Sequence, residues 1–308
     1  MILNTGSRTD IPAFYSEWFM NRIREGFVLV RNPYYPKQVT RYELDPSVVD
    51  VLVFCTKDPF NILKHIDELK RFRIYFNVTI TPYGRDIEPN LRHKKDIMDS
   101  FKELSGMIGS DHIAWRYDPI FLDEKYTKQY HLMIFEKMCA YLKGYTDTII
   151  ISFIDLYEKT KRNFPGIKEV SYEDQCYLCE NFVKIAKRYD MKIRTCLEKE
   201  DLKRYGADVS GCLTKEVLEK ATGLELNIKD LSYAREGCRC LLGNDIGAYN
   251  TCMHLCKYCY ANYDERIVKD NYLKHDPKSP LLIGDIEEGD VIRNAHQVSC
   301  ISDQIRLF

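Results

Sequence analysis

The sequence predicts an α/β protein: a partial or complete β/α barrel of the TIM type, with a C-terminal cysteine-rich segment packed on the barrel mouth. Three observations predict this fold. Short apolar runs alternate with amphipathic stretches up to about residue 205, a rhythm typical of parallel strands joined by helices. Charged residues follow one predicted strand after another. Of the twelve cysteines, five fall between Cys238 and Cys259.

The predicted elements follow in chain order. Apolar runs predict strands over residues 2–7, 51–56, 73–81, 112–116, 148–155 and 192–198. Amphipathic patterns between them predict helices over residues 16–25, 61–72, 94–108, 127–142 and 172–189, and a further helix over 214–221. We expect residues 1–231 to form the barrel-like domain. Residues 232–308 should form a cysteine-rich segment of the same globular unit.

Composition limits the classes of protein to which the chain can belong. With 308 residues, 45% of them hydrophobic, the chain can bury a large core. A net charge of -1 gives no electrostatic reason for nonspecific nucleic-acid binding. The N-terminus lacks the features of a signal peptide, and no apolar run is long enough to span a bilayer. We therefore expect a cytoplasmic protein with no membrane partner, in which clustered cysteines bind metal instead of forming disulfides.

Charged side chains at the ends of the predicted strands form the first candidate site. The carboxyl ends of parallel barrel strands converge on one mouth, so these residues should face a shared cavity and are candidates for catalysis. The cations suit an anionic group such as a carboxylate or phosphate, and the acids suit polar donors or proton transfer. Capping of the following helices and mutual ion pairing are the alternative. The residues are Arg8, Asp10, Lys57, Asp58, Arg116, Asp118, Asp155 and Glu198.

Three cysteines near the C-terminus form the second candidate site. Cys252, Cys256 and Cys259, hereafter the triad, could hold three irons of a [4Fe-4S] cluster and leave the fourth iron open for a reacting ligand. The aromatic residues beside these thiols favour iron-sulfur. A zinc site made from Cys238, Cys240 and two triad cysteines is the alternative. His254 could join it as a ligand or could simply be solvated.

Four further cysteines raise the number of possible clusters to two. Cys196, Cys212, Cys238 and Cys240 could close a second, fully ligated cluster suited to electron transfer. The alternative is that Cys196 and Cys212 are small buried apolar residues. Helical spacing predicts that Cys176 and Cys179 pack in the core.

Several segments resemble one bacterial family. They are residues 8–14, 18–22, 29–33, 83–86, 245–249, 256–262 and 275–277. The chain is identified on them as a member of the domain of unknown function 1848 family, whose cysteine cluster looks like that of radical S-adenosylmethionine (SAM) enzymes. The resemblance implies that the triad binds the cluster and that SAM binds the remaining iron. Tyr258 takes the aromatic place beside the last ligand, and Asp245 and Tyr249 are further candidates for cofactor contact.

Two features depart from the radical SAM pattern. The triad follows all the predicted strands, whereas those enzymes usually carry it after the first strand. No Gly-Gly-Glu-like segment is present to bind the SAM amino group, so a substrate or a water could occupy the fourth iron instead.

The resulting functional prediction is a radical SAM-like iron-sulfur enzyme. It would act on a polar or anionic small molecule and would need an electron donor such as ferredoxin or flavodoxin. One alternative is an iron-sulfur enzyme that uses the open iron for redox or Lewis-acid chemistry without SAM. Another is a zinc-stabilised protein that binds a ligand or nucleic acid.

Overall fold

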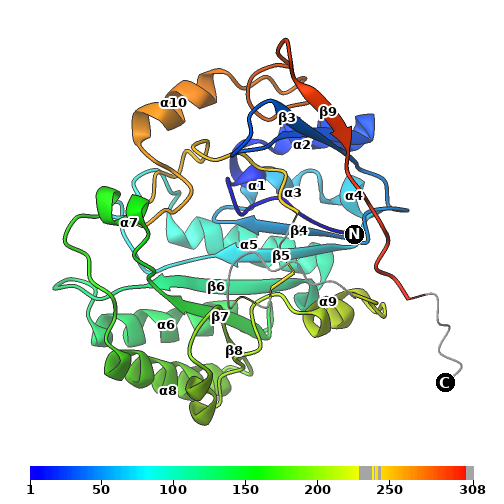
Figure 1. Cartoon of the computed structure of the whole chain (residues 1–308). Helices are drawn as coiled ribbons and strands as arrows, with labels where there is room; N and C mark the ends of the chain where they lie inside the picture. The colour runs from blue at the N-terminus through cyan, green and yellow to red at the C-terminus, as the bar shows by residue number, and fades with distance from the viewer. Residues whose placement is uncertain (229–237, 239, 242–243, 303–308) are drawn as a thin grey trace, which may run out of the picture.

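The computed structural model describes residues 1–228, 238, 240–241 and 244–302. Its main feature is a six-stranded, all-parallel sheet (Figure 1). The strands lie in the order β1 (Ile2–Asn4), β4 (Val51–Thr56), β5 (Ile74–Thr79), β6 (Ile113–Ile120), β7 (Thr148–Phe153) and β8 (Lys192–Thr195). This confirms the α/β class and the parallel arrangement expected from the apolar runs.

Both faces of the sheet are largely buried, which explains why its central strands are mostly apolar. Along β4, Leu52 and Phe54 pack in the larger core, and Val51 and Val53 pack in a second core on the other face. On the first face, side chains of the helices pack against the sheet to complete the core. On the second face, α9 (Lys215–Thr222) and the cysteine-containing segment near Leu241 do so. The cysteine segment therefore covers the sheet face opposite the main helices.

The long helices α2 (Ser16–Glu25), α5 (Lys94–Ile108), α6 (Lys128–Leu142) and α8 (Tyr172–Arg188) lie where the amphipathic patterns predicted them, and the structure adds several shorter helices. These are α1 (Ile11–Phe14), α3 (Phe60–Leu63), α4 (Ile66–Leu69), α7 (Glu158–Asn163) and α10 (Glu265–Leu273). Short 3-10 helices span Ser110–His112 and Glu200–Tyr205. The helix expected over 61–72 is instead the pair α3 and α4. Cys176 and Cys179 pack in the core from α8.

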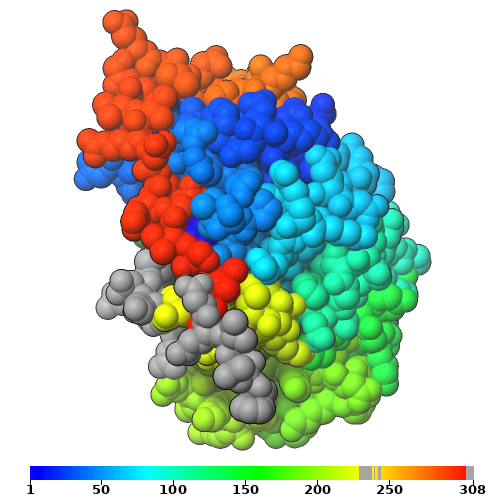
Figure 2. Space-filling model, turned by 90° about the vertical axis from the view of Figure 1, so that its right-hand side faces the viewer, coloured from blue at the N-terminus to red at the C-terminus, as the bar shows by residue number. Residues whose placement is uncertain are grey.

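A second, three-stranded sheet was not expected from the sequence. In it β2 (Phe27–Arg31) pairs antiparallel with β3 (Gln38–Glu43), and β3 pairs in parallel with β9 (Val291–Asn294). Figure 1 shows β9 beside β3, and Figure 2 shows C-terminal residues, in orange and red, lying against N-terminal residues, in blue. The chain thus returns to its beginning, and the boundary expected at 231/232 lies outside the described residues.

No closed barrel is found in the part of the chain that the structure describes. Isolated bridges continue the sheet by one position at each edge, from Asn4 to Asp245 beside β1 and from Arg194 to Asp208 beside β8. Between these two added segments the described residues form no ladder. A complete TIM barrel is therefore not confirmed. Among the described residues, no helix has both the length and the apolar character needed to cross a membrane.

A buried histidine beneath β6 predicts a pH-dependent stability. His131 Nε2 donates to the carbonyl of Phe121 at 2.9 Å, so Nδ1 accepts from the Tyr117 hydroxyl at 2.8 Å. Burial lowers the pKa of His131 from 6.5 to about 4. As the pH falls below 6.5 the unfolded chain takes up a proton that the folded chain resists, so stability is lost between these values. The loss should total about 3 kcal/mol, at about 1.4 kcal/mol per pH unit.

The measurement is urea unfolding at several pH values between 4 and 7. His131→Gln should flatten the pH dependence relative to the parent, and His296→Gln, at an exposed position, should not. Equal pH slopes for the parent and His131→Gln would contradict the assignment.

Candidate functional site

A cavity of about 430 Å³ lies at the carboxyl ends of the large sheet. All six of its strands, or the residues that directly follow them, contribute to the lining, which runs from Gly6 after β1 to Cys196 after β8. Seventeen of the candidate residues line it: Arg8, Asp10, Lys57, Arg116, Asp118, Asp155, Cys196, Cys212, Cys238, Cys240, Asp245, Tyr249, Cys252, His254, Cys256, Tyr258 and Cys259. Glu198 and Asp58 are not among the lining residues.

Asp245 fastens the C-terminal segment to the exit of β1. Its carboxylate accepts from the backbone N–H of Ser7 at 2.7 Å and of Gly247 at 2.8 Å, and burial raises its pKa. Arg8 is held by long contacts: Nη1 donates to the carbonyl of Asp245 at 3.4 Å, Nε lies 3.9 Å from the Asp245 carboxylate, and the guanidinium lies 5.7 Å from the centre of the Tyr249 ring. Asp245 therefore uses its oxygens to position the loop, and Arg8 keeps freedom to contact a ligand.

Asp10 joins the triad loop to the sheet. One carboxylate oxygen caps α1 by accepting from Ala13 N–H at 3.0 Å. The other accepts from Lys57 N–H at 2.7 Å and lies 2.9 Å from His254 Nε2. The ring of His254 packs edge-on against Phe14, with 4.5 Å between ring centres. Asp10 thus has the capping role given above as the alternative, although it also lines the cavity.

Arg116 and Asp118 form an ion pair inside the cavity. Both side chains come from β6, and Ser152 on β7 donates to Asp118 at 3.0 Å. Burial alone would lower the pKa of Arg116, but Asp118 and nearby cysteines outweigh burial and raise it. The guanidinium is therefore a fixed positive charge on this wall.

A buried charge network lies next to the triad. Glu88 pairs with Lys57 at 2.9 Å and with Lys94, and it accepts from Thr81 at 2.7 Å. The Tyr258 hydroxyl lies 2.8 Å from Lys57 Nζ and also contacts Glu88. Burial alone would raise the pKa of Glu88, but the two lysines lower it to about 2.

The sequence reasoning missed Glu88 and Lys94. Neither belongs to a recognisable spacing, because both lie well past the end of β5 in a loop and at the start of α5. The available signal was Glu88 itself, a carboxylate shortly after the family-like segment 83–86.

The last two acids differ in their surroundings. Asp155 is exposed and accepts from the Tyr157 hydroxyl at 3.3 Å. Glu198 accepts from the backbone N–H of Phe153 at 2.7 Å, and burial raises its pKa to about 8. Between Cys196 and Glu198, Leu197 has φ of 60°, the left-handed region that disfavours a bulky side chain. This backbone conformation helps to place Cys196 in the cavity wall while Glu198 lies outside it.

The triad lies in a loop that is fastened on several sides. Tyr15 donates to the carbonyl of Thr251 at 2.7 Å, Lys257 N–H donates to Ile87 at 3.0 Å, and Asn262 donates to Cys252 at 2.8 Å. Leu255, between Cys252 and Cys256, has φ of 54°. Such a costly conformation is retained only when its surroundings enforce it.

The triad thiols interact electrostatically with one another. Burial raises the pKa of each thiol. Asp10 and then the neighbouring thiols raise the pKa of Cys252 further, whereas for Cys256 the raising effects of Glu88 and Cys259 are opposed by Lys57. For Cys256 the pKa rises to about 12. The sulfur of Cys259 accepts the N–H of Ala261 at 3.3 Å. A bound metal would favour the thiolate forms that this crowding disfavours.

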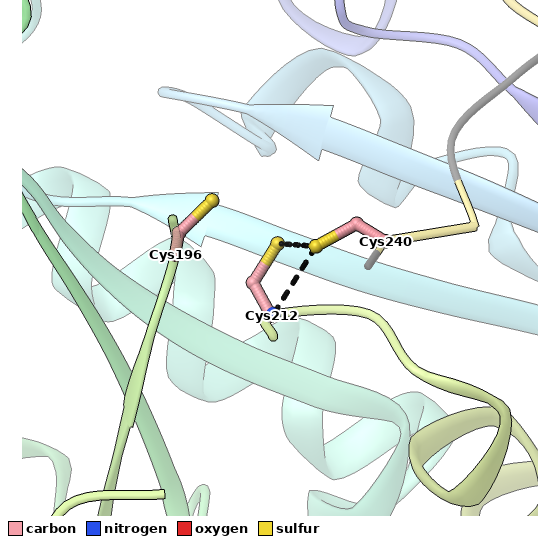
Figure 3. Close-up of side chains that lie close together, drawn as sticks. All are labelled: Cys196, Cys212 and Cys240. Carbon is pink, nitrogen blue, oxygen red and sulfur yellow. Dashed lines mark hydrogen bonds between the residues drawn. The ribbon is translucent and has the colours of Figure 1, made fainter. Parts of the chain in front are cut away.

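A second group of thiols is more compact. The sulfurs of Cys196, Cys212 and Cys240 all lie within 4.8 Å of one another and are buried, hereafter the compact group. Figure 3 shows the sulfurs of Cys212 and Cys240 pointing toward each other, 3.0 Å apart. Cys240 N–H donates to the sulfur of Cys238 at 3.4 Å. The structure thus joins Cys240 to Cys196 and Cys212, not to two triad cysteines as the zinc alternative required.

Comparisons with known proteins identify the family. No curated protein and no solved structure matches the chain significantly. The family model for "Domain of unknown function (DUF1848)" matches residues 2–261. That range contains the whole large sheet, the compact group and the triad. The family expectation drawn from the sequence is confirmed: the chain belongs to the DUF1848 family.

Proposed function

We propose that this protein is an iron-sulfur enzyme of the radical SAM type that acts on a small polar or anionic substrate. The observation that carries the proposal is the shared cavity: the triad and the charged strand ends line one space of about 430 Å³. A thiol group without a neighbouring pocket would suit a structural metal. Thiols that open onto a charged pocket suit chemistry on a bound molecule.

We assign a cubane cluster to the triad in preference to a single ion. Its three sulfurs do not all lie within 4.8 Å of one another, in contrast to the compact group. Because each thiolate of a cubane binds a different iron, the sulfurs must stand further apart than around one ion. The N–H donated to Cys259 is also typical of cluster thiolates. When bound, such a cluster would supply the electron that cleaves SAM.

The chain's own residues would hold and orient the substrate. Lys57 is committed to Glu88 at 2.9 Å, and Arg116 is committed to Asp118. Arg8 has longer contacts, 3.4 Å to the carbonyl and 3.9 Å to the carboxylate of Asp245, so we assign it the substrate anion. Tyr249 and Tyr258 offer aromatic rings on the wall for SAM. We place the reaction in the cytoplasm, with a ferredoxin or flavodoxin as electron donor.

The test is SAM cleavage by anaerobically purified protein. The parent should be brown and, once reduced with dithionite, should form 5′-deoxyadenosine from added SAM. Cys256→Ala should lose iron and product formation together, because two thiols hold a cluster poorly. Cys139→Ala, a buried cysteine of α6 outside the cavity, is the matched control and should keep both.

Two other results would favour the alternatives. An intact cluster that forms no 5′-deoxyadenosine would favour iron-sulfur chemistry without SAM. Colourless protein with zinc at the triad would favour a zinc-stabilised binding protein.

A further inference from the structure

We propose that the compact group, with Cys238 as fourth ligand, binds a single tetrahedral metal ion, zinc by preference, as a centre distinct from the triad. The sequence suggested a second iron-sulfur cluster at these four cysteines. The geometry points to a single metal ion instead of a four-iron cluster. This inference does not require that the triad binds SAM.

The spacing of the sulfurs is the first argument. Four thiolates around one zinc ion, each at about 2.3 Å from the metal, stand about 3.8 Å apart in a tetrahedron. Cys196, Cys212 and Cys240 lie within 4.8 Å of one another, close to this spacing. The 3.0 Å pair of Cys212 and Cys240 would need to open slightly, whereas a cubane would require all three to spread widely.

The position of Cys238 is the second argument. It precedes Cys240 by two residues, is buried, and lines the same cavity. Its sulfur accepts the N–H of Cys240 at 3.4 Å, which places it next to the compact group. We therefore assign Cys238 as the fourth thiolate beside the compact group.

The charge around the compact group is the third argument. A zinc ion with four thiolates carries a net charge of about -2, which needs compensation when it is buried. The buried guanidinium of Arg116 lies beside this group and interacts with the sulfurs of Cys212 and Cys196. Arg116 therefore connects the proposed centre to Asp118 in the cavity.

The proposed ion would hold one wall of the cavity in place. The compact group joins the end of β8 to two separate segments, and Leu241 N–H donates to the carbonyl of Leu213 at 2.9 Å beside it. Leu213 and Leu241 also belong to the core on this face of the sheet. Among the described residues, no backbone ladder joins the β1 edge of the large sheet to its β8 edge. The proposed ion would link the segments at these two edges instead.

Elemental analysis of anaerobically purified full-length protein tests the proposal. We expect about one zinc per chain in the parent, as for a structural site. The double variant Cys212→Ala/Cys240→Ala should lose this zinc and keep its iron. The variant Cys252→Ala/Cys256→Ala should lose iron and keep zinc, and Cys139→Ala should keep both.

A measurement on the parent protein covers the case in which the double variant does not fold. Zinc-edge X-ray absorption should show four sulfur ligands at about 2.3 Å. Loss of iron from Cys212→Ala/Cys240→Ala with no zinc in the parent would overturn the proposal in favour of a second cluster. A Cys212–Cys240 disulfide with no zinc would overturn it as well. Because zinc content and SAM cleavage are separate readouts, either proposal can fail without the other.

Discussion

Replacing Glu88 with alanine is expected to lower the free energy of unfolding by about 3–5 kcal/mol, because it leaves buried ammonium groups without their counter-ion. The side chain of Glu88 is 1% exposed, and it pairs with Lys57 and Lys94, whose side chains are 14% and 24% exposed. Urea unfolding at neutral pH measures the loss. Glu103→Ala, at an exposed position of α5, should change stability by less than about 0.5 kcal/mol.

A second variant separates lost pairing from lost packing. Glu88→Ala/Lys94→Met removes one of the stranded cations, so it should recover part of the stability that Glu88→Ala loses. If Glu88→Ala lowers the free energy of unfolding no more than Glu103→Ala does, the ion pairs of Glu88 contribute no net stability, which would contradict this prediction.

Replacing Gly6 with alanine is expected to cost about 3 kcal/mol through overpacking. A Cβ at this position would lie 2.1 Å from the carbonyl oxygen of Cys55, a backbone atom of β4. Relief would require β1 to move away from β4, with which it pairs through residues Ile2, Leu3 and Asn4. Thermal unfolding measures the effect.

Gly106→Ala is the matched control for this substitution. Gly106 lies inside α5, and an added Cβ would meet nothing within 4 Å. It should therefore gain about 0.5–1 kcal/mol, since alanine favours a helix over glycine. A Gly6→Ala protein as stable as its parent would mean that β1 and β4 are not packed as closely as described.

Long, regular patterns in the sequence predicted the elements well. The run 51–56 and the pattern 94–108 coincide with β4 and α5, since burial on both faces of a strand or along one face of a helix leaves a clear signal. The small sheet gave no such signal. The residues of β9 are all exposed, and their partner β3 lies about 250 residues earlier in the chain.

The sequence likewise predicted some parts of the candidate site and missed others. Arg8, Lys57 and Arg116 could be placed together beforehand because parallel strands end at one edge. The meeting of Cys196 with Cys240 could not, because sequence separation carries no information on distance across a fold. Glu88 was missed for the same reason, as its loop turns back toward Tyr258.

The return of the chain to its own start has a consequence for biosynthesis. Asn4 pairs with Asp245, and β3 pairs with β9. Residues made early and residues made late must therefore come together before the edge of the large sheet and the small sheet are complete. Both thiol groups include residues from the last quarter of the chain. A ribosome-bound nascent chain therefore holds only part of each thiol group, and neither group can be completed until residues 240–259 have left the ribosome.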